Sequence, residues 1–144
     1  MTINSFEDLE IWQEAHCLAK YVFELTKKEN FSKDFRFRDQ IRASSGSIMD
    51  NIAEGFERGG NKEFSQFLSI AKGSNGETRS QSYRAHDYSY IDDAEFKKLL
   101  NNTASLATKI GNLIDYLKKS EFKGKKYKYQ NPPSQKKPKE PKEP

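Results

Sequence analysis

The sequence predicts an all-α protein, an antiparallel up-down-up-down four-helix bundle over residues 1–117, followed by a basic tail over residues 118–144. Three observations support this fold class. The first 117 residues contain no proline and only one valine, Val22, so helix breakers and the most strand-favouring residue are nearly absent. Apolar residues recur at helical spacing in four segments. Short connections near residues 30, 59 and 91 make consecutive helices antiparallel neighbours.

The first helix is expected from about Phe6 to Lys28. Ser5 is placed as its N-cap, and Asp8 three residues later completes a weak capping box. The apolar stripe follows steps of three and four: Leu9, Trp12, Ala15, Ala19, Val22, Phe23 and Thr26, widened by Ile11, Leu18 and Leu25.

The second helix is expected to start near Ser32 and to end near Gly55. Its inner face would be formed by Phe37, Ile41, Ser45, Ile48 and Ile52. The glycines at positions 59 and 60 then form a turn, and Asn61 is a suitable N-cap for the third helix. That helix carries its apolar residues early and continues in small and polar residues toward Ala85.

The fourth helix is expected to begin at Asp92 and Asp93, because acidic residues are favourable at a helix N-terminus. Its apolar stripe alternates steps of three and four without a gap: Phe96, Leu99, Thr103, Leu106, Ile110, Leu113 and Leu117. A spacing of 3.5 residues is typical of the seam of a left-handed helical bundle.

The middle of the second and third helices is unusually rich in glycine and serine. Glycine inside a helix costs about 1 kcal/mol relative to alanine, so these residues need a reason. If the two helices are antiparallel about the turn at residues 59 and 60, the numbers of two facing residues sum to about 119. Three facing pairs follow: Gly46 with Gly73, Ser45 with Ser74, and Arg42 with Glu77. We expect a close approach of the two backbones, with an ion pair between Arg42 and Glu77. A ligand or nucleic-acid groove and an oligomer contact are the alternatives.

The end of the second helix carries the polar residues Asn51, Glu54 and Arg58. Glu54 and Arg58 are four residues apart and can pair on one helix face. A general-base role for Glu54 finds no second carboxylate, histidine or nucleophile fixed beside it. We therefore expect Asn51 and Glu54 to cap the helix or to form interhelical hydrogen bonds.

Charge is distributed unevenly along the chain. The formal net charge is +4, but the tail carries ten lysines and three glutamates, a net of +7, which leaves −3 for the first 117 residues. Candidate nucleic-acid contacts in the bundle are Arg36, Arg38, Arg42, Arg79 and Arg84. Those in the tail are Lys118, Lys119, Lys123, Lys125, Lys126 and Lys128, interleaved with Tyr127 and Tyr129 on which bases could stack. The alternative for the tail is a solvated segment that only aids solubility.

The residue pattern supports no catalytic site, metal site or cofactor. His16 and His86 lie on different predicted helices without further ligands at metal-binding spacing, and the lone Cys17 cannot form an internal disulfide. No phosphate-binding glycine motif occurs. Because no catalytic motif is found, we expect a protein that is not an enzyme. The chain has no apolar run long enough to span a membrane and no secretory signal, so we expect a cytoplasmic location.

Several motifs resemble those of the bacterial four-helix-bundle family known as 23S rRNA intervening-sequence proteins. The resemblance runs from about Phe6 to Leu117. It is carried by residues 6–9 (FEDL) with Trp12, residues 40–44 (QIRAS), Ser47 and Ile48, residues 51–55 (NIAEG) with Phe56 and Arg58, Glu63, Phe64, Phe67, Leu68, residues 71–74 (AKGS) and Glu77. Within these motifs Asn51, Glu54, Gly55, Arg58, Gly73, Ser74 and Glu77 are taken as structural positions. The lysine- and proline-rich tail lies outside the family pattern.

The resemblance implies antiparallel four-helix protomers that assemble as a ring-shaped homopentamer, in a family not known for enzymes. It also implies a relation to the accessory variability determinant proteins of retroelements, which are basic pentamers that bind nucleic acid and a reverse transcriptase. Two functions follow as expectations. The first is a non-catalytic homo-oligomer that associates with nucleic acid, RNA rather than DNA being favoured. The second is an assembly protein that recruits a polymerase-like partner, such as a reverse transcriptase, without binding nucleic acid itself.

Overall fold

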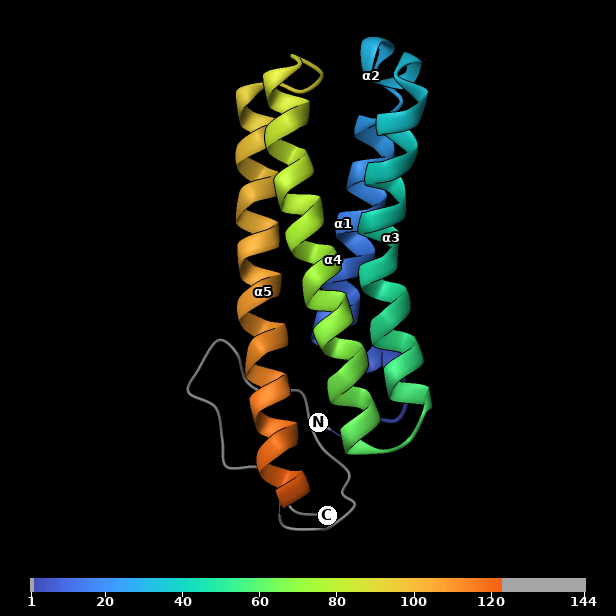
Figure 1. Cartoon of the computed structure of the whole chain (residues 1–144), viewed down its shortest axis with the longest axis vertical. Helices are drawn as coiled ribbons and strands as arrows, with labels where there is room; N and C mark the ends of the chain where they lie inside the picture. Colours follow the sequence, from blue (N-terminus) through green and yellow to red (C-terminus); the bar gives the residue numbers. More distant parts are fainter. Residues whose placement is uncertain (1, 123–144) are drawn as a thin grey trace.

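The computed structural model describes residues 2–122, and it confirms the predicted helical bundle (Figure 1). Four long helices run alternately up and down: α1 (Glu10–Leu25), α3 (Phe35–Glu57), α4 (Asn61–Asp87) and α5 (Asp93–Phe122). Two short elements precede α1 and α3, the 3-10 turn η1 (Phe6–Asp8) and α2 (Glu29–Lys33). No strand is found in this part of the chain.

The buried core follows the predicted apolar stripes most closely on α3 and α5. The five inner positions predicted for α3 are all buried, as are six of the seven predicted for α5; Phe96 is half-buried. On α1 the buried positions are Ile11, Ala15, Leu18, Val22 and Leu25. Phe23 was expected on this stripe, but 42% of its surface is exposed. Ala15 and Val22 thus confirm part of the predicted stripe, and the other three buried positions were expected only to widen it.

The first predicted helix is interrupted near its start. Ser5 and Asp8 form the expected capping box, but they cap η1 rather than α1. Leu9 has an extended backbone, with φ −77° and ψ 129°, and its side chain is completely buried. This arrangement lets Leu9 enter the core from the extended segment that separates η1 from α1.

The caps of the later helices are close to those expected. Asp34 separates α2 from α3, and its carboxylate accepts a hydrogen bond from the Phe37 amide at 3.3 Å. The prediction of Asn61 as an N-cap is wrong by one residue, because Asn61 is the first residue of α4 and Gly60 is its N-cap. At the start of α5, Asp92 Oδ1 accepts from the Glu95 amide at 2.8 Å, while Glu95 Oε1 accepts from the Asp92 amide at 2.9 Å. The acidic start predicted for the fourth helix is thus a complete capping box.

Polar side chains line the interface between α3 and α4. The Ser44 hydroxyl lies 2.9 Å from Thr78 Oγ1 and donates to Gln81 Oε1 at 2.6 Å. One turn along the seam, the hydroxyls of Ser47 and Ser74 are 3.0 Å apart. Ser44, Thr78 and Gln81 are buried, so these hydrogen bonds satisfy groups that water cannot reach.

The predicted close approach at Gly46 and Gly73 is wrong. A Cβ atom built at either glycine would meet no other atom within 4 Å, so neither makes room for the neighbouring helix. The predicted ion pair between Arg42 and Glu77 is also absent from the described structure, because Arg42 Nε donates to Thr26 Oγ1 on the α1 side at 2.8 Å. The glycine that α3 requires for packing is Gly55, beside the turn into α4.

The last helix extends beyond the boundary expected from the apolar stripe. α5 continues to Phe122, and both Leu117 and Ser120 are buried. α5 therefore ends at the end of the bundle where α1 begins (Figure 1). None of the described helices is both long and apolar enough to cross a membrane.

Candidate nucleic-acid interface

Cations and aromatic rings alternate where the C-terminal part of α1 lies beside the N-terminal part of α3. We call Phe23, Lys27, Phe35, Arg38 and Arg42 the α1–α3 edge. The Arg38 guanidinium carbon lies 5.0 Å from the Phe35 ring centroid, and that of Arg42 lies 4.4 Å from the Phe23 centroid. Lys27 Nζ is 4.9 Å from the Phe23 centroid. All three cations of the edge are thus held close to rings.

Helical spacing brings these residues together. Phe35 and Arg38 are one turn apart on α3, and Arg42 follows one turn later. Phe23 lies in the last turn of α1, and Lys27 follows four residues later in the turn after this helix. Thr26, which is fully buried, donates its hydroxyl to the Phe23 carbonyl at 2.7 Å and accepts from Arg42. This threonine therefore fixes Arg42 against α1.

The α1–α3 edge also contains acidic neighbours. Asp39 lies 3.0 Å from Arg38 Nε, and Glu24 lies 3.4 Å from Lys27 Nζ. Both pairs involve side chains with substantial exposure, so they are screened by water and salt. Arg42 forms no ion pair with a described carboxylate. It is therefore the cation of the edge that would have no carboxylate partner to give up when an external anion binds.

A second group of cations and rings lies between α3 and α4 at the same end of the bundle. The Arg84 guanidinium carbon is 4.4 Å from the Phe37 centroid and 5.9 Å from that of Tyr88. Arg36 is exposed and pairs with none of the described acidic residues. Arg36, Arg38 and Arg42 therefore lie in the N-terminal half of α3, and Arg84 lies in the adjacent C-terminal part of α4.

The fifth predicted arginine has a different environment. Arg79 is half-buried, and its Nη1 donates to the Leu100 carbonyl at 2.7 Å and to Thr103 Oγ1 at 3.1 Å. These bonds join α4 to α5. The guanidinium is used inside the bundle, so Arg79 does not belong to either of the cation–ring groups.

The predicted contacts in the tail are mostly outside the described residues. Lys118 and Lys119 are exposed on the last turns of α5. Lys123, Lys125, Lys126 and Lys128 lie beyond Phe122, as do Tyr127 and Tyr129.

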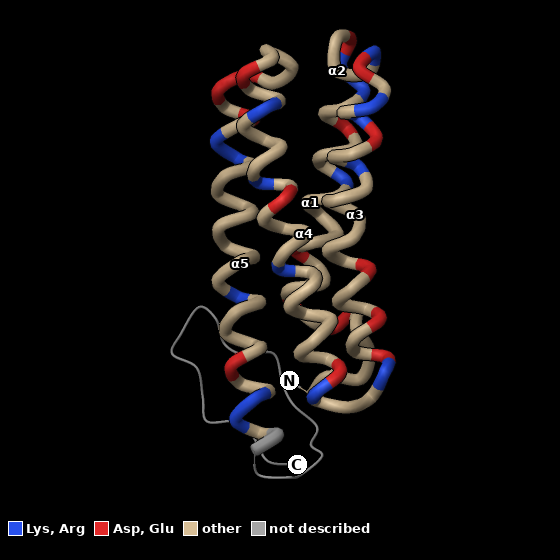
Figure 2. Tube along the Cα trace, in the orientation of Figure 1, with Lys and Arg blue, Asp and Glu red and all other residues tan. Residues whose placement is uncertain are grey.

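Acidic residues occupy the C-terminal half of α3. Asp50, Glu54 and Glu57 are exposed there, whereas the basic residues of this helix are concentrated in its N-terminal half (Figure 2). Phosphate groups are repelled by the first set and attracted by the second. On α3 itself, the N-terminal half would therefore attract a phosphate group and the C-terminal half would repel it.

The family-type motif residues mostly have structural contacts. Arg58 Nη2 lies 3.1 Å from Glu54 Oε2, as the spacing predicts. Asn51 Nδ2 donates to the Ser47 carbonyl at 2.8 Å and to its hydroxyl at 2.9 Å, so its bonds stay within α3 instead of crossing to another helix. Gly55 packs against α4 and Ser74 bonds across the seam, whereas Gly73 and Glu77 are exposed.

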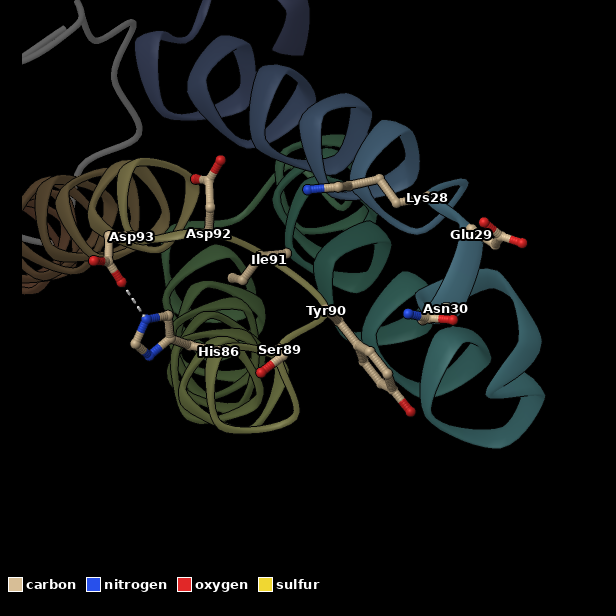
Figure 3. A pocket seen from close by; sticks show the side chains of 9 residues that line it. All are labelled: Lys28, Glu29, Asn30, His86, Ser89, Tyr90, Ile91, Asp92 and Asp93. Carbon is tan, nitrogen blue, oxygen red and sulfur yellow. Dashed lines mark hydrogen bonds and ion pairs between the residues drawn. The ribbon is translucent and has the colours of Figure 1, made fainter.

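An open hollow of about 560 Å³ lies between the α1–α2 and α4–α5 connections (Figure 3). His86 Nε2 lies 2.7 Å from Asp93 Oδ1, and the His86 ring stacks on Phe96 with centroids 4.3 Å apart. Lys28 is paired with Glu95 at 2.6 Å. No three His, Cys, Asp or Glu side chains gather at metal-binding distance among the described residues. Among the lining residues His86 and Asp93 therefore pair with each other, whereas Lys28 pairs with Glu95, which lies outside the lining.

Three members of the α1–α3 edge were not predicted from the sequence. Phe23 was assigned to the core, and Phe35 and Lys27 were given no role. The spacing of Phe35 and Arg38 was visible in the segment FRFR at positions 35–38 and indicates a ring and a cation on one helix face. The pairing of Arg42 with Phe23 could not be found in this way, because it depends on how α1 and α3 are aligned.

Comparisons with known proteins find a solved structure with a similar fold and a matching family model. The crystal structure of a protein of unknown function from the S23 ribosomal protein family of Bacteroides thetaiotaomicron superposes with a TM-score of 0.66 at 20% sequence identity. The match covers 72% of this chain and 97% of the other chain. A search of curated proteins finds no significant match. The family model for the 23S rRNA-intervening sequence protein matches residues 7–112, and the chain therefore belongs to this family.

Proposed function

We propose that this protein is a non-catalytic oligomer that associates with nucleic acid, with RNA as the favoured ligand. The observation that carries the proposal is the placement of Arg36, Arg38, Arg42 and Arg84 at one end of the bundle, three of them beside aromatic rings. Guanidinium groups are suited to phosphates because they donate several hydrogen bonds from a planar fork. A ring beneath a guanidinium helps to hold it in place.

The tail supports the same function through charge. It adds a net +7 to a bundle of net −3, so each protomer gains a long-range attraction for phosphates that the bundle lacks. Binding through several cations releases counterions and should weaken steeply with salt. Several tails in one oligomer would raise the overall affinity by avidity.

Anisotropy of a labelled RNA strand tests the proposal, with salt raised from about 50 to 200 mM. The proteins are the full chain, a chain ending at Phe122 and the full chain with Arg38→Gln and Arg42→Gln. Ending at Phe122 keeps α5 intact, whereas ending at Leu117 would remove the buried Ser120. We expect both altered proteins to bind more weakly and with a smaller salt dependence. An absence of RNA binding by the full chain at low salt contradicts the proposal.

Self-association is the second part of the proposal, and a homopentamer is the favoured form. Small residues lie along the outward face of α4 at Ser69, Gly73, Gly76 and Ser80, and exposed apolar side chains flank them. Ile70 is 53% exposed and Tyr83 is 47% exposed. Because Cβ atoms at Gly73 and Gly76 would meet nothing within 4 Å, this face is open to a second molecule.

Light scattering after gel filtration tests self-association. A pentamer should have a mass near five times the chain mass of 16.7 kDa. Gly73→Leu should lower that mass without unfolding the protomer, because the added side chain points into open space. A wild-type protein that is strictly monomeric contradicts the oligomer.

The outward face of α4 also favours a second candidate function, the assembly protein that recruits a polymerase-like partner. The exposed Ile70 and Tyr83 are suited to a protein contact rather than to phosphates. An oligomer that fails to bind RNA in the anisotropy experiment would favour this candidate over nucleic-acid association.

A further inference from the structure

The most exposed large apolar side chain of the described bundle belongs to the α1–α3 edge. Phe35 is 64% exposed at the first position of α3, and Phe23 in the same edge is 42% exposed. Leaving a phenylalanine in water has no benefit for folding. In both cases an arginine lies close to the ring, which keeps a positive charge beside the exposed apolar surface.

We propose that the α1–α3 edge binds an unpaired nucleic-acid strand, with bases stacking on Phe35 and phosphates contacting Arg38 and Arg42. This inference rests on the proposed function and specifies which form of nucleic acid is bound. Stacking needs bases whose faces are free, which a single strand offers and the interior of a duplex does not. Proteins that bind single strands combine these two features, cations along the backbone and rings for the bases.

The charges of the α1–α3 edge predict that each protomer binds a strand with only modest affinity. Arg38 would have to share its guanidinium among Asp39, the Ser32 carbonyl and a phosphate, whereas Arg42 has no carboxylate to give up. Arg42 is also fixed by its hydrogen bond to Thr26, so less side-chain freedom is lost when a phosphate binds. Phe35 lies at the start of α3, where its ring is not enclosed by neighbouring helices.

The test compares an oligouridine strand with a duplex of the same length, both labelled and measured by anisotropy with the full chain. Two variants of one residue separate stacking from simple apolar contact. Phe35→Leu removes the ring and keeps an apolar side chain, whereas Phe35→Tyr keeps a ring. We expect the wild type to prefer the strand. Phe35→Leu should weaken strand binding on the order of tenfold and leave duplex binding unchanged, while Phe35→Tyr should bind the strand as the wild type does.

Each other result has a distinct meaning. Equal affinity for strand and duplex, with no effect of Phe35→Leu, overturns this inference and leaves nucleic-acid association standing. A strand preference that Phe35→Leu does not change also overturns it, because the stacking rings would then lie elsewhere in the chain. Failure to bind either probe overturns the proposed function together with this inference.

Discussion

Gly55 on α3 lies directly against Phe67 on α4: a Cβ atom at Gly55 would be 2.6 Å from the Phe67 Cβ and 3.0 Å from Phe64 Cδ1. The first contact is with an atom fixed to the backbone, so it cannot be relieved by a side-chain rotation. Gly55 is therefore the position at which α3 and α4 require the absence of a side chain. It also belongs to the NIAEG motif.

Gly55→Ala should destabilise the bundle. The added methyl group forces α3 and α4 apart beside their turn, and overpacking of this kind costs about 1–3 kcal/mol. The free energy of unfolding, from urea denaturation followed by circular dichroism, measures the effect. Gly46→Ala is the matched control, because its methyl group enters open space and alanine is the better helix former by about 1 kcal/mol. Equal stability of the Gly55→Ala protein and the wild type would show that the two helices can separate freely.

The sequence predicted the existence and order of the long helices because each depends on local periodicity and caps. The stripe of α5 and the acids at Asp92 and Asp93 are read from one segment at a time. Breaks within a segment were harder to predict. Neither the extended backbone at Leu9 nor the short helix before Asp34 interrupts the apolar spacing, so the pattern continues through both.

The partners across the α3–α4 seam were predicted two to three positions out of register. The expected sum of facing residue numbers was 119, but Ser47 faces Ser74 and Ser44 faces Thr78, which give 121 and 122. Side chains on a helix lean toward its N-terminus, so each covers the surface about one position before its own Cα. In an antiparallel pair the two shifts add, which accounts for the difference.

The candidate site was predicted only in part, because the alignment of one helix against another is not determined by the spacing within either helix. Arg36, Arg38, Arg42 and Arg84 were identified by their charge, which is a property of single residues. The environment of Arg79 depends on the carbonyl of Leu100 in another helix. The rings beside the other arginines likewise depend on helix alignment, which no spacing in one segment determines.

Ser44→Ala should destabilise the α3–α4 seam. Ser44 donates to Gln81 Oε1 and contacts Thr78 Oγ1, and all three side chains are buried. Removing one hydroxyl leaves a buried acceptor without its partner, which costs about 1–3 kcal/mol. Urea denaturation measures this loss. Gln40→Ala is the control at an exposed position of α3, where stability should change by less than about 0.5 kcal/mol.

Arg79→Gln should reduce stability while leaving RNA affinity within about twofold of the wild type, because a half-buried arginine bonded to Leu100 and Thr103 is a structural residue. Arg42→Gln should lower RNA affinity by a larger factor, since its guanidinium faces the α1–α3 edge. Thermal unfolding and RNA anisotropy, measured on both variants, separate the two effects. Weaker RNA binding by Arg79→Gln at a temperature where it is fully folded would place this arginine among the contacts.

Lys109 should stabilise the bundle at neutral pH and lose its effect at strongly alkaline pH. Its ammonium group donates to Glu10 Oε2 at 2.7 Å and also to Glu14, which ties α5 to α1. Burial lowers the pKa of Lys109, but these hydrogen bonds and the two negative charges outweigh burial, so the pKa is raised above its ordinary value of 10.5. The folded protein therefore holds this proton more tightly than the unfolded chain.

The sign of the pH dependence follows from that difference. Below pH 10.5 the lysine is protonated in both states, and its stabilising effect is fully present. As pH rises from there through the folded pKa, the unfolded chain loses the proton first and the contribution declines. Lys109→Met should thus be less stable than the wild type near pH 7, with the difference shrinking above pH 10.5. Urea denaturation across this range measures it, and Lys97→Met, at an exposed position of the same helix, is the control. A difference that stays constant through the alkaline range would mean that Lys109 acts by packing of its aliphatic stem rather than by its charge.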